Sequence, residues 1–278
     1  MKKMTLFKAA CVQVNASNDM DTNIAKAGDM VREAAAQGAH LICLPENVAM
    51  MEFGGENVIA KSYPQAEHPG LSAFRDLAVE TKSWILIGSL AVRLENGKVA
   101  NRCFLLNDQG EIVGQYDKIH LFDVDLAGGE SYRESNTFDG GDRAVLAQTP
   151  WGPLGMSICY DVRFPHLYRD YAQAGANIIT VPAAFTKQTG EAHWKVLLRA
   201  RAIETGCYVI APGQCGEHKG GRQTYGHSLI INPWGEVLAE GADEPCVLIA
   251  DIDVDAVAAT RGKIPSLKHD RAYQLDRS

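Results

Sequence analysis

The chain has 278 residues, of which 46% are hydrophobic and 22% charged, as in a globular protein that buries a sizeable core. Its formal net charge of -7 argues against a general nucleic-acid-binding role, because phosphates are bound by basic surfaces. No stretch approaches the ~20 consecutive apolar residues of a membrane span, so a membrane protein is not expected either. A small-molecule substrate fits this composition.

Seven cysteines stand at irregular spacings without a CxxC pair, so no disulfide framework is expected and a reducing compartment is favoured. Lys8 interrupts the apolar run near the N-terminus, which is then too short for a signal peptide, and we expect a cytoplasmic protein. The cysteine and the histidine of the stretch 215–218 could supply half of the ligands of a metal site, but the sequence has no second pair of ligands at a suitable spacing. We therefore expect no metal.

Hydrophobic periodicity predicts helices and strands in alternation over the first part of the chain. Apolar residues alternate from Phe7 to Val14, which predicts a strand, and Asp21 or Thr22 can cap a helix that runs to about Gln37. The elements predicted after it are strand 39–44, helix 72–82, strand 84–90 and the hairpin strands 102–107 and 111–116. Such alternation indicates a sheet covered by helices.

The segment 118–142 is polar and glycine-rich, which predicts a long irregular loop of the kind that is usually functional. Alternation then returns, with strands 145–148 and 154–158, helix 165–174, strand 176–181, helix 193–205, strand 208–211, a hairpin of 228–231 and 237–239, strand 246–252 and a short helix near 255–261. No linker divides the chain. We predict one α/β domain over residues 1–278, a four-layer α-β-β-α sandwich.

Cys159 is the first candidate for chemistry, because an apolar strand delivers it to a turn that leads into the next helix. Such junctions hold a nucleophile firmly and can aim backbone N–H groups at an oxyanion, whereas the alternative is a buried structural cysteine. A thiol with a pKa of ~8.5 needs a base or a cationic neighbour to react. The histidines that could serve as that base are His120, His166, His193 and His227.

Three charged side chains complete the candidates. Glu46 follows the apolar run 41–45, where desolvation is predicted to raise its pKa and make it a base, unless it is an exposed turn residue. Lys118 ends a strand, where it could hold an oxyanion or stabilise a thiolate, or simply be solvated. Glu134 lies in the predicted long loop, and its position alone does not indicate a function. Sites collect at the carboxyl ends of strands in α/β sheets, so Glu46, Lys118 and Cys159 are expected to meet.

Three motifs that contain these residues are spread along the chain: Leu44-Pro45-Glu46-Asn47, Tyr116-Asp117-Lys118-Ile119-His120-Leu121 and Cys159-Tyr160-Asp161-Val162-Arg163-Phe164-Pro165. Through them the sequence resembles the nitrilase superfamily of carbon–nitrogen hydrolases. With the further matching stretches 182–185, 193–194, 199–204, 225–228 and 232–235, the resemblance covers almost the whole chain. The resemblance implies an α-β-β-α sandwich, a homodimer, and hydrolysis of an amide without a metal or organic cofactor.

The resemblance also implies a role for each candidate. Glu46 is the base, Lys118 stabilises the oxyanion and Cys159 is the nucleophile. Glu134 orients Lys118, either as a catalytic or as a structural residue, and the backbone N–H of Tyr160 is the second oxyanion donor. The thiolate attacks the amide carbonyl and forms a thioester, which a water activated by Glu46 then hydrolyses.

Within the superfamily the chain is most similar to the deaminated-glutathione amidase branch, through the stretches 134–136, 199–205 and 214–216. The omega-amidase branch, which acts on 2-oxoglutaramate, shares Phe122-Asp123, and other small amides or carbamoyl compounds stay open. Both named substrates join an amide to an anionic 2-oxo acid, which implies a cationic or hydroxyl-rich pocket. The candidates for binding the substrate are Arg163, Phe185 and Thr186, which neighbour Cys159 or follow a later strand.

Other classes of protein are weighed against this reading. True nitrilases carry Cys-Trp-Glu at the nucleophile, whereas this chain has Cys159-Tyr160-Asp161, which favours an amidase. A non-enzymatic dimeric binding module is the alternative from another class, and an intact set of three catalytic residues argues against it. A zinc hydrolase lacks the ligand spacing that zinc requires.

Overall fold

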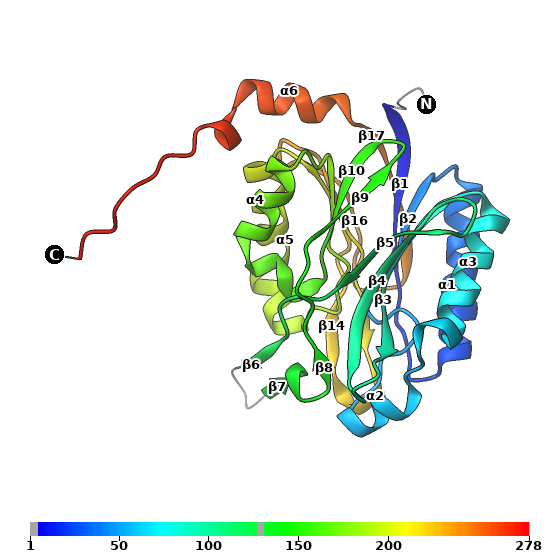
Figure 1. Cartoon of the computed structure of the whole chain (residues 1–278). Coiled ribbons are helices and arrows are strands. Elements are labelled where there is room, and N and C mark those ends of the chain that lie inside the picture. Colours follow the sequence, from blue (N-terminus) through cyan, green and yellow to red (C-terminus); the bar gives the residue numbers. More distant parts are fainter. Residues whose placement is uncertain (1–4, 127–130, 278) are drawn as a thin grey trace.

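The computed structural model of the protein describes residues 5–126 and 131–277. Two β-sheets pack face to face and helices cover their outer surfaces, in four layers (Figure 1). The predicted α-β-β-α sandwich is therefore confirmed. The covering helices are α1 (Met20–Ala36) and α3 (Pro69–Thr81) on one side, and α4 (Pro165–Gln173) and α5 (Lys187–Thr205) on the other.

The first sheet has the strand order β17-β1-β2-β3-β4-β5, and β8 pairs with β4 beside it. Strands β1, β2 and β3 run parallel, whereas β17 is antiparallel to β1, and β4 is antiparallel to β3 and β5. Glu46 follows β2 and Lys118 directly follows β5. The strands are β1 (Leu6–Gln13), β2 (Leu41–Cys43), β3 (Trp84–Arg93), β4 (Val99–Leu106), β5 (Ile112–Asp117), β8 (Phe138–Asp139) and β17 (Cys246–Asp253).

The second sheet has the order β16-β15-β12-β11-β10-β9. Its middle strands β10, β11 and β12 run parallel, so their carboxyl ends lie along one edge. Cys159 follows β10 at that edge. The strands are β9 (Val145–Thr149), β10 (Gly152–Met156), β11 (Ile178–Thr180), β12 (Tyr208–Ala211), β15 (Leu229–Ile231) and β16 (Val237–Glu240).

Apolar side chains fill the space between the two sheets. Cys43 and Leu86 from the first sheet and Leu154 and Ile178 from the second are fully buried there. A second cluster, between the first sheet and its helices, includes Phe74 of α3. Interiors packed in this way barely deform, so the strand ends that carry the candidate residues are held at fixed positions.

Residues 118–142 differ from the predicted irregular loop. Strands β6 (Asp123–Asp125) and β7 (Ser131–Arg133) form a short antiparallel hairpin, a turn of 3-10 helix covers Glu134–Asn136, and β8 joins the first sheet. Arg133 pairs with Asp125 at 2.8 Å across the hairpin. These strands are too short and too polar to produce a hydrophobic period, so the sequence pattern did not predict them.

Other elements were missed or misplaced for similar reasons. Helix α5 begins at Lys187 rather than at residue 193, because Thr186 caps a polar first turn by accepting a hydrogen bond from the Thr189 N–H. The prediction left out α2 (Gly55–Lys61) and the hairpin of β13 (Cys215–Glu217) and β14 (Gln223–Tyr225). The last helix, α6 (Asp255–Lys263), precedes a terminal segment that leaves the sandwich (Figure 1).

The helices can also be compared with the thickness of a membrane. Within residues 5–126 and 131–277, none is both long and apolar enough to cross a bilayer.

Candidate active site

Glu46, Lys118 and Cys159, which the sequence predicted to meet, lie together where the ends of β2, β5 and β10 converge. The Nζ of Lys118 lies 3.0 Å from Oε1 of Glu46 and 2.9 Å from Oε2 of Glu134. Cys159 faces the same point, and its thiol interacts with both the Glu46 carboxylate and the Lys118 ammonium. Glu46, Lys118 and Cys159 are 3%, 2% and 7% exposed, so these charges interact with little screening by water.

Glu46 is held by a complete set of hydrogen bonds. Its Oε1 accepts from Lys118 and, at 2.8 Å, from Nδ2 of Asn101, while its Oε2 accepts the backbone N–H of Ala184 at 2.7 Å. Its own carbonyl accepts from Nε2 of Gln214 at 3.0 Å. Gly88 of β3 allows this turn, because a Cβ there would lie 2.0 Å from the carbonyl oxygen of residue 44.

Asn101 of β4 links the two glutamates. Its Nδ2 lies 2.8 Å from Oε1 of Glu46 and 3.1 Å from Oε1 of Glu134. Glu134 is also bound by the backbone N–H of Phe122, at 2.6 Å from Oε2. Sequence reasoning missed Asn101, although an amide within the mostly apolar run 99–106 was a usable signal.

The backbone at Cys159 is strained. Its φ of 49° is uncommon for a residue with a side chain, and its N–H is fixed by the Pro182 carbonyl at 2.9 Å. Cys159 begins a short 3-10 helix that includes Tyr160. N–H groups at the start of a helix have no partner within it, so the N–H of Tyr160, the residue next to Cys159, is not used by the helix itself.

Asp161 joins the turn of Cys159 to the segment of Lys118, a role that the sequence did not reveal. It is fully buried, and its Oδ2 accepts from the Ile158 N–H at 2.8 Å and from the Tyr116 hydroxyl at 2.7 Å. Its Oδ1 accepts the His120 N–H at 3.1 Å and lies 2.7 Å from Nδ1 of the same residue. One carboxylate therefore fixes two catalytic segments relative to each other.

The charges of the site follow from these contacts. Burial acts to raise the pKa of Glu46, but the Lys118 ammonium and several hydrogen bonds hold that pKa below its ordinary value of 4.5. Desolvation thus acts in the predicted direction, but the net shift in the pKa of Glu46 is downward, opposite to the prediction. Burial would lower the pKa of Lys118, yet Glu134 and Glu46 raise it above 10.5. Burial and then Glu46 raise the pKa of the Cys159 thiol well above 9.0.

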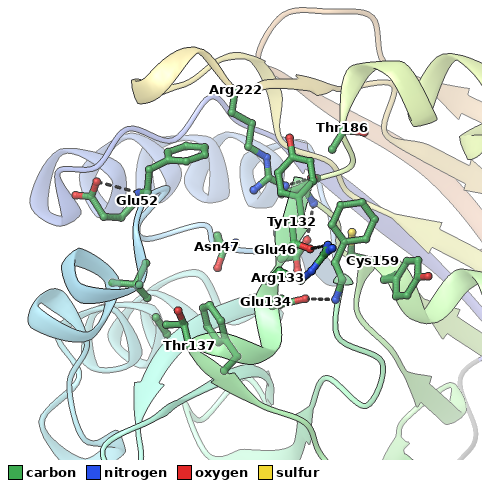
Figure 2. A pocket seen from close by; sticks show the side chains of 18 of the residues that line it. Glu46, Asn47, Glu52, Tyr132, Arg133, Glu134, Thr137, Cys159, Thr186 and Arg222 are labelled. Atoms are coloured by element: carbon green, nitrogen blue, oxygen red, sulfur yellow. Dashed lines mark hydrogen bonds between the residues drawn. The ribbon is translucent and has the colours of Figure 1, made fainter. Parts of the chain in front are cut away.

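A cavity of about 430 Å³ opens onto these groups (Figure 2). Of the predicted substrate-binding residues, Phe185 and Thr186 line it. Arg163 is not among the described lining residues: its guanidinium lies 5.3 Å from the centre of the Phe185 ring, and Nη1 lies 3.4 Å from Nδ1 of His193. The described lining contains no histidine, so none of the four considered as the base reaches the cavity.

The family model for carbon-nitrogen hydrolases matches residues 8–262. The chain belongs to the carbon–nitrogen hydrolase family. A deaminated glutathione amidase from Synechocystis sp. (strain PCC 6803 / GT-S) is 40% identical over 270 residues, which cover 96% of this chain and 98% of that protein. This carbon–nitrogen hydrolase is thus of the amidase type, as the sequence predicted. The domain boundaries 1 and 278, outside the matched stretch, stay a prediction.

Solved structures show the same relationship for this hydrolase. The C. elegans NitFhit protein superposes with a TM-score of 0.91 at 33% identity, covering 96% of this chain and 66% of that one, so the chain spans just under two thirds of its length. Saccharomyces cerevisiae Nit3, a member of branch 10 of the nitrilase superfamily, gives a TM-score of 0.86 at 26% identity, covering 95% and 96%. The fold of the hydrolase is that of the nitrilase superfamily.

The stretch 215–218, considered above as half of a metal site, has a structural place in the hydrolase. The ring of His218 is bound at both nitrogens, with Nδ1 lying 2.8 Å from the Ala16 carbonyl and Nε2 lying 2.7 Å from Oγ1 of Thr224. In the described part of the chain, no three histidine, cysteine or acidic side chains cluster in a way that could hold a metal ion.

The hydrolase is expected to keep its activity in moderate acid. The pKa of Glu46 lies below 4.5 in the folded protein, so this carboxylate stays charged at pH 5 and contributes stability that is lost only as the pH falls through its folded value. With a neutral amide as substrate, kcat/KM should be constant from about pH 8 to pH 5.5 and decline below pH 4.5. A pH profile with its acid midpoint near 6.5 would contradict this assignment of the base.

Proposed function

We propose that the protein hydrolyses a small carboxamide with Cys159 as nucleophile, Glu46 as base and Lys118 as oxyanion donor. The observation that carries the proposal is the convergence of a thiol, a carboxylate and an ammonium group in one buried site beside a cavity. Because the pKa of the thiol is raised and that of the carboxylate is lowered, proton transfer to Glu46 accompanies the attack on the carbonyl carbon.

Each later step of the proposed mechanism uses the same groups. The tetrahedral oxyanion is held by Lys118 and the Tyr160 N–H, and loss of one such donor typically costs ~10²–10³ in rate. Glu46 returns its proton to the departing nitrogen, which leaves a thioester on Cys159. A water that Glu46 deprotonates then releases the acid and restores the thiol. Glu134, bound to the ammonium at 2.9 Å, holds Lys118 in place.

The substrate that we propose is deaminated glutathione. A relative 40% identical over nearly the full length of both chains carries that name, and the lining of the cavity contains the hydroxyl of Thr186 and the guanidinium of Arg222. These groups suit a substrate whose acyl part is a 2-oxo acid. 2-Oxoglutaramate carries the same acyl part and is the alternative substrate.

The two candidate substrates can be separated by one measurement. Both release 2-oxoglutarate on hydrolysis, so a single coupled assay gives kcat/KM for each on the same enzyme preparation. We expect deaminated glutathione to be preferred by at least tenfold, or ~1.4 kcal/mol of transition-state binding. A preference for 2-oxoglutaramate would reverse the assignment of substrate, and no turnover of any amide would overturn the proposed function.

We also propose that the protein forms a homodimer. Three large apolar side chains, Ile203 of α5, Trp234 and Ile264, are 55%, 50% and 59% exposed and line one shallow cavity of about 110 Å³. Such a surface patch is typical of an interface between subunits. Light scattering should give twice the chain mass, and a monomer at micromolar concentration would contradict the proposal.

A reducing compartment such as the cytoplasm is proposed as the location. The cysteines that the structure describes are all free thiols, and all but Cys246 are buried. Free thiols persist where glutathione keeps them reduced. Fractionation of the source cells tests this location, and recovery of the protein from a secreted fraction would oppose it.

A further inference from the structure

We propose that Arg222 binds a carboxylate on the acyl part of the amide substrate and thereby selects anionic substrates. This inference rests on the proposed function and adds a residue that sequence reasoning did not find. Arg222 lies in the turn between β13 and β14, a hairpin that hydrogen-bonds to the cavity wall through the Tyr225 N–H and the Phe185 carbonyl at 2.9 Å. This hydrogen bond fixes the hairpin that carries Arg222 against the cavity.

The guanidinium of Arg222 has few hydrogen-bond partners in the part of the chain that the structure describes. It makes one hydrogen bond, from Nη2 to the Ala184 carbonyl at 2.8 Å, and its buried Nε has no acceptor. An arginine has five N–H donors, and leaving a buried donor without an acceptor costs about 1–3 kcal/mol. A carboxylate that accepts from Nε would satisfy this donor.

The ion pairs around the cavity also indicate that Arg222 binds a carboxylate. Of the cations that line it, Lys118 is bound by two glutamates and Arg133 is bound by Asp125 at 2.8 Å. The lining carboxylate that lies away from the catalytic groups, Glu52, is bound by Lys61. Among the residues described, only Arg222 brings a cation to the cavity without a carboxylate within 4 Å, so its charge is available to pair with an anionic group of the substrate.

The surroundings of Arg222 strengthen its attraction for an anion. Its guanidinium lies 5.4 Å from the ring centre of Tyr132 and 6.0 Å from that of Phe53, so aromatic rings flank it and limit its contact with water. Figure 2 shows its side chain extending toward Tyr132, on the side of the cavity where Glu46 and Cys159 lie. Ala184 connects the two sites, since its carbonyl binds Arg222 and its N–H binds Glu46.

The anion that we propose at Arg222 belongs to the acyl part, which deaminated glutathione and 2-oxoglutaramate share. A primary amide has ammonia as its leaving group, so a carboxylate in such a substrate can only be part of the acyl chain. Glutaramate, the monoamide of glutaric acid, and glutaramide, its neutral diamide, differ only in this carboxylate. They are therefore a matched pair of probes for the proposed contact.

The test is kcat/KM for glutaramate and glutaramide in the wild-type protein and in Arg222→Gln. We expect the wild type to prefer glutaramate, and the variant to lose about 100-fold on glutaramate, mainly through KM, because charge-assisted hydrogen bonds contribute about 1.5–3 kcal/mol. Activity on glutaramide should change less than threefold. Arg222→Lys, which keeps the charge, should recover part of the preference even if the glutamine variant folds poorly.

Two further variants complete the design. Lys219→Gln removes an exposed charge from the same turn and should leave both rates unchanged. Arg163→Gln removes the arginine that the sequence favoured. Selective loss on glutaramate in Arg163→Gln but not in Arg222→Gln would overturn the proposal, as would an equal loss on both amides in Arg222→Gln. Failure of the wild type to hydrolyse these two amides and also deaminated glutathione and 2-oxoglutaramate would instead remove the proposed function on which it rests.

Discussion

Replacing Cys159 with alanine is expected to lower kcat/KM for the amide substrate by about 10⁴-fold or more while the protein stays folded. The variant removes the atom that forms the thioester, and among the described residues no other cysteine lines the cavity to replace it. Steady-state assays measure the loss, and mass spectrometry of the quenched wild-type reaction should detect the acyl-enzyme.

A second cysteine provides the control for this result. Cys207 is fully buried beside β12, where its Sγ contacts the Ala176 carbonyl and the guanidinium of Arg261. Cys207→Ala should lower the melting temperature and keep kcat, which is the reverse of the pattern for Cys159→Ala. Wild-type turnover in Cys159→Ala would remove this residue from the mechanism.

The sequence predicted those parts of the site that lie directly after apolar strands. Glu46, Lys118 and Cys159 each follow a strand that hydrophobic periodicity detects, and the packed sheets bring these strand ends together. Glu134 was assigned only through the family resemblance, because its segment is polar. The structure then shows why it belongs to the site: the backbone N–H of Phe122 and the amide of Asn101 hold its carboxylate against Lys118.

The residues that the sequence did not reveal are those whose role depends on three-dimensional contacts. Asp161 is part of a recognised motif, yet three of its four contacts reach the distant segment 116–120, which no spacing encodes. Arg222 lies in a polar turn that resembles any solvated loop. The pKa of Glu46 was predicted in the wrong direction for the same reason, because the sequence showed its burial and not the distance to Lys118.

Replacing Lys118 with methionine is expected to damage both catalysis and stability. The ammonium lies between Glu46 and Glu134, and all three side chains are largely buried. Removing one partner of a buried ionic group leaves uncompensated charge, which typically costs about 3–5 kcal/mol. For a chain of this size we expect a fall of about 10 °C in the melting temperature at pH 8. Turnover should fall at least ~10³-fold, because the oxyanion donor is lost.

The way in which the stability of Lys118→Met depends on pH gives a sharper test. Without the lysine, the two buried carboxylates repel each other, and one of them should have a pKa above its ordinary value of 4.5. A carboxyl whose pKa is raised by folding stabilises the folded state below its unfolded pKa, and this stability is lost as the pH rises through the folded value. The melting temperature of Lys118→Met should therefore rise between pH 8 and pH 5, relative to that of the wild type.

A second substitution separates the two effects of the lysine. In Lys118→Met combined with Glu134→Gln, one of the two buried charges is gone, so much of the stability at pH 8 should return and its dependence on pH should weaken. Activity should stay lost, since no ammonium faces the oxyanion. If Lys118→Met were as stable as the wild type at pH 8 and showed no pH dependence, the ammonium would not be what compensates the two glutamates. The site would then have to hold its carboxylates apart by hydrogen bonds such as those from Asn101 alone.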